Sequence, residues 1–79
     1  MEFKKVESSN IKEVAFNNDK LYVTFNGGGT YAYDSSEDEF KRFLESESKG
    51  KFFHTNLKGK SFEKITPEKL QEIISQNNI

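Results

Sequence analysis

The sequence contains no cysteine, one histidine and one proline, and it has no long hydrophobic run. Without cysteine there is no disulfide, no thiolate nucleophile and no cysteine-based zinc site. His54 is the sole histidine, which argues against a three-ligand catalytic metal site, so we expect no metal and no cofactor. No apolar stretch approaches the ~20 residues of a membrane span, and the N-terminus lacks the apolar segment of a signal peptide. We therefore expect no membrane association and a cytoplasmic protein.

Charged residues are plentiful but unevenly placed along the 79-residue chain, whose length predicts a single domain spanning residues 1–79. The 12 basic and 13 acidic residues nearly cancel, so the net charge of −1 does not by itself indicate a polyanionic partner. Six acids lie within residues 34–47, whereas five lysines and one glutamate lie within residues 49–64. Such an uneven distribution of charge can orient a binding partner on the surface.

Alternating apolar residues predict a first β-hairpin, with strands over residues 11–17 and 20–25. A two-residue turn at Asn18-Asp19 pairs Phe16 with Leu21 and places alternate side chains on opposite faces. Residues 4–7 are compatible with an additional edge strand.

The stretch NGGGTYAYD, residues 26–34, predicts a second hairpin with two alternative registers. A two- or four-residue loop places Tyr31 and Tyr33 on the face opposite the apolar residues, where the rings could stack on bases. A three-residue loop, with Gly28 in the left-handed region, places them beside Val23 and Leu21 in the core. Burial of two aromatic rings favours the core register.

Two amphipathic helices are expected to follow. The first covers about residues 37–47, with Ser36 and Glu39 as a capping box and Phe40 in its apolar stripe. Thr66 and Pro67 begin the second, over residues 66–77. Between them, residues 51–58 can form a short helical turn and residues 60–65 an extended segment. The predicted fold is α+β: an antiparallel β-meander of three or four strands, packed on one face by two amphipathic helices.

Three segments in this order resemble the KTSC domain, a small domain found at the C-terminus of some lysyl-tRNA synthetases and alone in bacterial and phage proteins. They are SSNI at residues 8–11, LYVTFNGGGTYAY at residues 21–33 and SKGKFFHTNLKGK at residues 48–60. The resemblance covers about residues 6–62, so the helix over 66–77 is an addition to the family core. It implies that the matching motif residues are structural: Ser9, Asn10, Tyr31, Tyr33, Gly50 and Phe53.

The chain departs from the family pattern at several positions. Ser35-Ser36 stands where a Val-Pro pair is common, and His54 replaces an asparagine that usually follows the Phe-Phe pair. Lys58 and Lys60 stand where arginines are frequent, and lysine keeps the charge but not the bidentate phosphate geometry. The synthetase context suggests weak binding of RNA or tRNA.

The lysine-rich segment 49–60 is the best candidate for nucleic-acid binding, because phosphates need cations and stacked bases need exposed rings. Its candidate contacts are Lys49, Lys51, His54, Lys58 and Lys60. We expect at least one of Phe52 and Phe53 to belong to the core, since a domain this small has few apolar residues to spare.

No catalytic motif is present: His54 has no paired nucleophile nearby in sequence, and the glycine triplet lacks the lysine of a P-loop. We therefore expect a non-enzymatic domain. Two functions remain open. The first is weak RNA binding through the lysine-rich segment, and the second is a protein-interaction or accessory role without nucleic acid.

Overall fold

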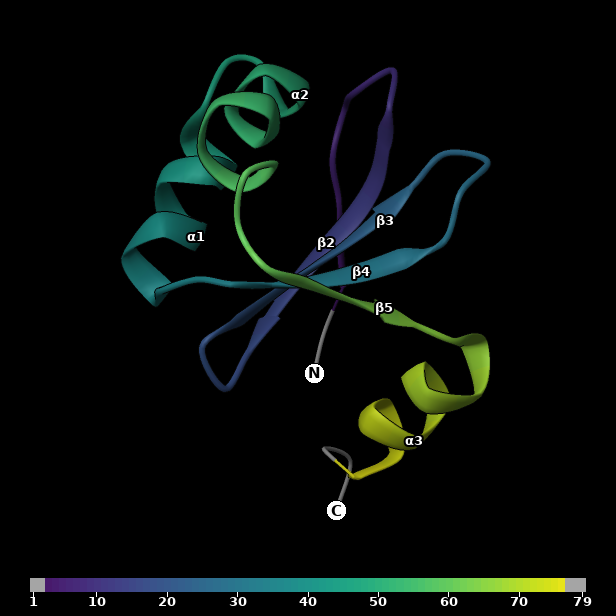
Figure 1. Cartoon of the computed structure of the whole chain (residues 1–79). Helices are drawn as coiled ribbons and strands as arrows, with labels where there is room; N and C mark the ends of the chain where they lie inside the picture. Colours follow the sequence, from purple (N-terminus) through teal and green to yellow (C-terminus); the bar gives the residue numbers. More distant parts are fainter. Residues whose placement is uncertain (1–2, 77–79) are drawn as a thin grey trace.

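A computed structural model describes residues 3–76 as a five-stranded antiparallel sheet with three helices, in the strand order β1-β2-β3-β4-β5 (Figure 1). The α+β meander predicted from the sequence is confirmed, with five strands in place of three or four. The elements are β1 (Lys4–Lys5), β2 (Ile11–Asn17), β3 (Lys20–Phe25), β4 (Thr30–Asp34), α1 (Glu37–Glu45), α2 (Lys49–Phe52), a π-helical turn (Phe53–Leu57), β5 (Phe62–Ile65) and α3 (Pro67–Gln76).

The β2–β3 hairpin has the predicted register, with Phe16 opposite Leu21. Its two turn residues, Asn18 and Asp19, have φ of 50° and 59°. Positive φ at both central residues is the geometry of a type I′ turn, whose twist matches that of the flanking strands. Asparagine and aspartate tolerate this left-handed region better than most residues do.

The β3–β4 hairpin adopts the core register: Tyr31 pairs with Val23 and Tyr33 with Leu21. Tyr33 is buried and Tyr31 half-buried, so the prediction that the rings face the core is confirmed. The loop has three residues as expected, but the left-handed residue is Gly27, with φ of 71°, and not Gly28. The reason is a tight turn in which the Gly28 N–H donates to the Phe25 carbonyl, which places Gly27 at the turn's third position.

Strand β2 contains a β-bulge at Lys12, which the sequence pattern did not predict. Ile11 pairs with Phe25 and Glu13 with Thr24, so two steps along β2 match one step along β3. This extra residue reverses the alternation, and Ile11 therefore points into the same core as Val14 and is fully buried.

The helices α1 and α2 and the π-helical turn cover one face of the sheet (Figure 1). Phe43 of α1 and Leu57 of the π-helical turn are fully buried against β2 and β3 side chains. The Ser36 hydroxyl accepts the Glu39 N–H at 3.1 Å, which is one half of the predicted capping box. The Glu39 carboxylate accepts instead from the Ser35 hydroxyl and from Lys60. The helix ends at Glu45, two residues earlier than expected, because Ser46 turns to extended backbone and its hydroxyl donates to the Phe43 carbonyl.

The helix α3 covers the opposite face, which corrects the expectation that both amphipathic helices share one face. Thr66 accepts the Lys69 N–H as a cap, and Leu70 and Ile73 pack on a second cluster. That cluster consists of the buried residues Ala15, Tyr22, Ala32 and Ile65. The predicted end of this helix at Asn77 lies outside the described residues. Helices therefore pack on both faces of the sheet.

Candidate functional site

Lys49 caps the end of α1 instead of projecting into solvent. Its Nζ donates to the carbonyl oxygens of Leu44 at 2.9 Å and Ser46 at 2.5 Å. A cation at this place satisfies orphan carbonyls and complements the negative end of the helix dipole. The structure therefore places this predicted nucleic-acid contact at carbonyl groups of the chain.

Lys60 is likewise held within the chain. Its Nζ donates to the Glu39 carboxylate at 2.6 Å and to the Asp34 carbonyl at 3.0 Å, tying the segment before β5 to the start of α1. Burial tends to raise the pKa of Glu39, but the hydrogen bonds from Lys60 and Ser35 outweigh it, and that pKa is lowered overall. Two of the five predicted nucleic-acid contacts, Lys49 and Lys60, are therefore engaged within the chain.

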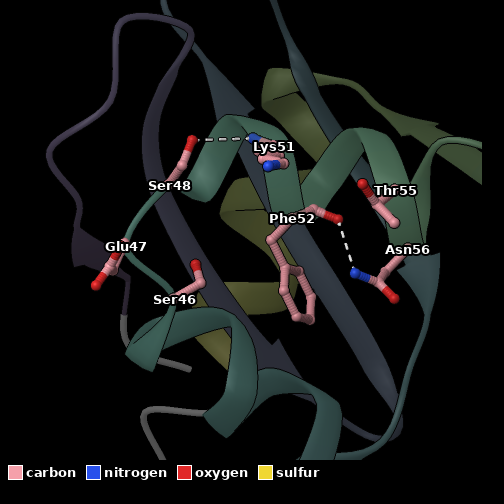
Figure 2. Close-up of a pocket in the computed structure, with 7 residues that line it drawn as sticks. All are labelled: Ser46, Glu47, Ser48, Lys51, Phe52, Thr55 and Asn56. Atoms are coloured by element: carbon pink, nitrogen blue, oxygen red, sulfur yellow. Dashed lines mark hydrogen bonds between the residues drawn. The ribbon is translucent and has the colours of Figure 1, made fainter.

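Lys51 lies at a shallow pocket of about 450 Å³ formed by the α1–α2 connection, α2 and the π-helical turn (Figure 2). The Ser48 hydroxyl accepts the Lys51 N–H and caps α2, and the Asn56 side chain donates to the Phe52 carbonyl one turn earlier in the same helical segment. Figure 2 shows the Phe52 ring turned toward α1. There it packs edge-to-face with the Phe43 ring, and the two ring centroids lie 5.4 Å apart. This ring packs with the core, as expected for at least one of the two phenylalanines.

A second pocket, of about 350 Å³, collects residues that the sequence placed in separate segments. It is lined by Asn10, Gly50, Phe53, His54 and Lys58, and we name it the Asn10 pocket. The sequence predicted three of these residues to be structural and two to bind nucleic acid. Only the tertiary fold brings them together.

Ile11, Phe25 and Asn26 complete the Asn10 pocket. The Phe25 and Phe53 rings meet edge-to-face at 5.2 Å and form its apolar floor. Asn10, Asn26, His54 and Lys58 supply its polar rim, and none of the lining residues is acidic. The pocket therefore combines an aromatic floor with amide groups and a cation.

Local hydrogen bonds hold the rim in place. The Ser8 hydroxyl accepts the N–H groups of Asn10 and Ile11, which shapes the turn before β2. The Asn26 N–H donates to the Asn10 carbonyl at 2.8 Å, and the Asn26 side chain donates to the carbonyls of Ser8 and Ser9. Ser9 thus contributes through its backbone, in keeping with the structural role that the family resemblance implies for it.

A row of contacting aromatic rings, which we call the aromatic surface, extends from the pocket to the edge of the sheet; its rings are half-buried except for Tyr33, which is buried, and Phe62, which is exposed. Successive ring centroids lie 5.2–5.8 Å apart, and the rings belong to Phe25, Tyr31, Tyr33, Phe53 and Phe62. Burial, and then the charge of Tyr31, raise the pKa of Tyr33. Phe62 is 60% exposed and pairs with Tyr33 across β4 and β5.

Sequence reasoning missed Phe62. The sequence signal was the alternation of apolar and polar residues in SFEKI, residues 61–65. This alternation predicts the face of Phe62 only if the segment is taken as a strand beside β4. That pairing would have placed Phe62 on the face of Tyr33.

The described part of the chain holds no group of three or more histidine or acidic residues suited to a metal ion. Among residues 3–76, no helix has the length and apolar character that crossing a bilayer requires.

Comparisons with known proteins agree with this geometry. Residues 7–62 match the family model of the KTSC domain. The structure is similar to the crystal structure of a KTSC domain protein from Yersinia pestis, with a TM-score of 0.77 and 32% sequence identity. That similarity covers 82% of this chain and 97% of the Yersinia chain. A search of curated proteins finds no match.

Proposed function

Since this chain belongs to the KTSC domain family, we propose that it is a small non-enzymatic domain that binds single-stranded RNA weakly. The observation that carries the proposal is the aromatic surface, which joins a pocket with a cationic rim to an exposed ring at the sheet edge. Binding of single strands relies on rings that stack with bases and on cations that follow the phosphates.

Three cationic or titratable side chains beside these rings are available to a ligand. His54 and Lys58 are exposed at the Asn10 pocket, and Lys64 lies opposite Tyr31 in the β4–β5 pairing. Within residues 3–76 none of the three forms a salt bridge, in contrast to Lys60. We assign phosphate contacts to Lys58 and Lys64 and remove Lys49 and Lys60 from the binding surface.

The test is a titration of short single-stranded RNA of mixed sequence into isotope-labelled protein, followed by backbone amide shifts. We expect the largest changes at residues 10, 26, 50, 53 and 58, with smaller ones along β5. Affinity should fall with salt, and a Lys58→Gln/Lys64→Gln variant should show a shallower slope of log K against log salt, by about 0.7 per lysine removed.

Lys41→Gln is the matched control, because this exposed lysine pairs with Glu37 on α1, away from the pocket. Its binding should equal that of the unchanged protein. Absence of RNA binding at low salt, or binding that does not respond to salt, would contradict the proposal.

A protein-interaction role is the second candidate, and the exposure of Phe62 on an edge strand favours it. β5 has β4 on one side only, so the backbone groups on its other side are open to an added strand. In this case Phe62→Ser should abolish capture of a specific partner by the immobilised protein, while Lys58→Gln/Lys64→Gln should not. A captured partner that is released by nuclease treatment would instead support the RNA role.

A further inference from the structure

We propose that the outer edge of β5 binds an extended peptide segment in which an acidic residue stands two positions before an apolar one. The segment pairs antiparallel with β5 and adds a strand to the sheet. The inference rests on the second candidate role, protein interaction, and does not depend on RNA binding. It combines an open backbone edge, an exposed ring and an exposed lysine on one strand.

The backbone of β5 has hydrogen-bonding groups on its outer side that the fold does not use. β4 pairs with β5 on one side only, from Phe62 to Ile65. In a strand the N–H and carbonyl of every second residue point to the same side, so half of these groups face away from β4. Among residues 3–76, no other backbone group forms a hydrogen bond with them. An extended peptide that adds to the edge satisfies these groups.

The opposite edge of the sheet is less suited to an added strand. β1 has only two residues, and both are exposed lysines. Short edge strands and lysine side chains discourage pairing with another chain. β5 has four residues and carries Phe62, which is 60% exposed. The two edges therefore differ, and β5 is the one that favours a partner.

The side chains of β5 define the chemistry of that partner. Phe62 and Lys64 are exposed and lie on the same face, opposite the two tyrosines of β4. Lys64 forms no salt bridge with a described residue, whereas Glu63, on the other face, is paired with Lys69 at 2.6 Å. Because directly opposite side chains interact, an apolar residue fits opposite Phe62 and a carboxylate fits opposite Lys64. In an antiparallel partner the acid therefore comes two positions before the apolar residue, with an uncharged residue between them.

A second copy of the chain fits this edge poorly. Two copies that pair antiparallel about a twofold axis place one residue opposite its own copy. A register centred on Glu63 or on Lys64 thus opposes two like charges, and a register centred on Phe62 places Lys60 opposite the second copy's Lys64. Like charges directly opposite each other destabilise the pairing. A four-residue strand also supplies little of the roughly 1,200 Å² that a stable interface buries.

The experiment measures binding of fluorescent peptides to the full chain after nuclease treatment. The first peptide is a threonine-rich segment of about seven residues with glutamate two positions before isoleucine, since threonine and isoleucine favour strands. The second has lysine in place of glutamate. We expect the glutamate peptide to bind about fivefold more tightly, the upper scale of one cross-strand pair. Lys64→Glu should reverse this preference.

Methylation of the peptide nitrogens tests the backbone pairing. Alternate amides of an added strand face β5, so N-methyl groups on one alternate set should abolish binding and those on the other set should not. An equal effect of both sets would show that the peptide is not held as a strand.

Phe62→Ser should weaken binding of both peptides, and the variant is expected to fold because this side chain is exposed. Lys4→Glu is the matched control for Lys64→Glu, because it makes the same change of charge at the other edge of the sheet. Lys58→Gln, at the Asn10 pocket, is the second control. Both control variants should keep the preference for the glutamate peptide.

The outcomes separate this inference from RNA binding. Equal affinity for the two peptides, or a preference that survives in Lys64→Glu, overturns the inference. A dimer in solution that Phe62→Ser dissociates also overturns it, because a second copy would then occupy the edge. Binding of RNA without binding of either peptide overturns the peptide site and leaves the RNA proposal in place, whereas the converse result overturns only the RNA proposal.

Discussion

Individual lysines in the segment 49–60 differ in what their ammonium groups contact. Lys49 and Lys60 donate to carbonyls and a carboxylate at the two ends of α1, so their charge stabilises the fold. Lys58 lies at the rim of the Asn10 pocket and is exposed. Lysines that are close together in the sequence therefore differ in role: Lys49 and Lys60 stabilise the fold, whereas Lys58 remains available to a ligand.

The bridge between Glu39 and Lys60 predicts a specific pH dependence of stability. The folded-state pKa of Glu39 lies below its ordinary value of 4.5, so the unfolded chain binds this proton more readily. The contribution of Glu39 is thus fully present above pH 4.5 and is lost as the pH falls through the folded-state pKa. We expect Glu39→Gln to lower the free energy of unfolding by about 1 kcal/mol at pH 7 and by much less in acid.

Urea unfolding at several pH values measures this difference. Glu45→Gln is the control, because Glu45 is exposed on the same helix and makes no ion pair with a described residue. An unchanged pH dependence in Glu39→Gln would show that the bridge does not contribute.

Turns and a bulge determine which face each strand presents. The type I′ turn at Asn18-Asp19 and the three-residue loop before β4 set the registers that carry Leu21, Val23 and Tyr33 into the core. The bulge at Lys12 adds Ile11 to the same face. Single residues of loop length thus decide the composition of a core.

One substitution in the turn between β2 and β3 is expected to stabilise the protein. Asp19 has φ of 59°, a conformation in which glycine carries no steric penalty. We expect Asp19→Gly to raise the free energy of unfolding by about 0.5–1 kcal/mol, since Asn-Gly is a preferred type I′ sequence. Thermal unfolding followed by circular dichroism measures the change.

Asn17→Gly is the matched control, because Asn17 is a strand residue without positive φ, where glycine lowers stability. Destabilisation by Asp19→Gly would mean that the aspartate side chain makes a contribution that outweighs the relief of strain.

For the whole molecule, the sheet separates two apolar clusters. One lies under α1, α2 and the π-helical turn, and the other lies under α3. The aromatic surface continues from the first cluster, whereas Leu70 belongs to the second. Stability contributed by α3 should therefore be separable from ligand binding.

We expect Leu70→Ala to lower the free energy of unfolding by about 1–2 kcal/mol, less than a fully buried leucine would cost, because Leu70 is half-buried. RNA affinity, measured at a temperature where the variant is folded, should not change. The exposed Gln71 provides the control substitution, Gln71→Ala. A loss of RNA binding in folded Leu70→Ala would place the ligand on, or couple it to, the α3 face.

Local interactions explain which features could be predicted from the sequence. The Asn18-Asp19 turn, the Ser36 cap and the Thr66 cap each depend on residues a few positions apart. The core register of Tyr31 and Tyr33 follows from loop length and the burial of rings. The side-chain patterns of these segments suffice to predict the turn, the caps and the favoured register, because the alternative registers and helix starts differ in local geometry and in the apolar area that they bury.

The sequence by itself determined the α+β class, the register of the first hairpin, the starts of the two amphipathic helices and the resemblance to the KTSC domain, and it favoured the core register of the second hairpin without excluding the other. Only the tertiary structure decided that Lys60 binds Glu39, that α3 lies on the second face, and that Asn10 and Phe53 meet in one pocket. The physical reason is the separation in sequence of the residues that make each contact. Turns and caps are set within a few residues, whereas a contact between distant residues depends on how the packed elements place them in space.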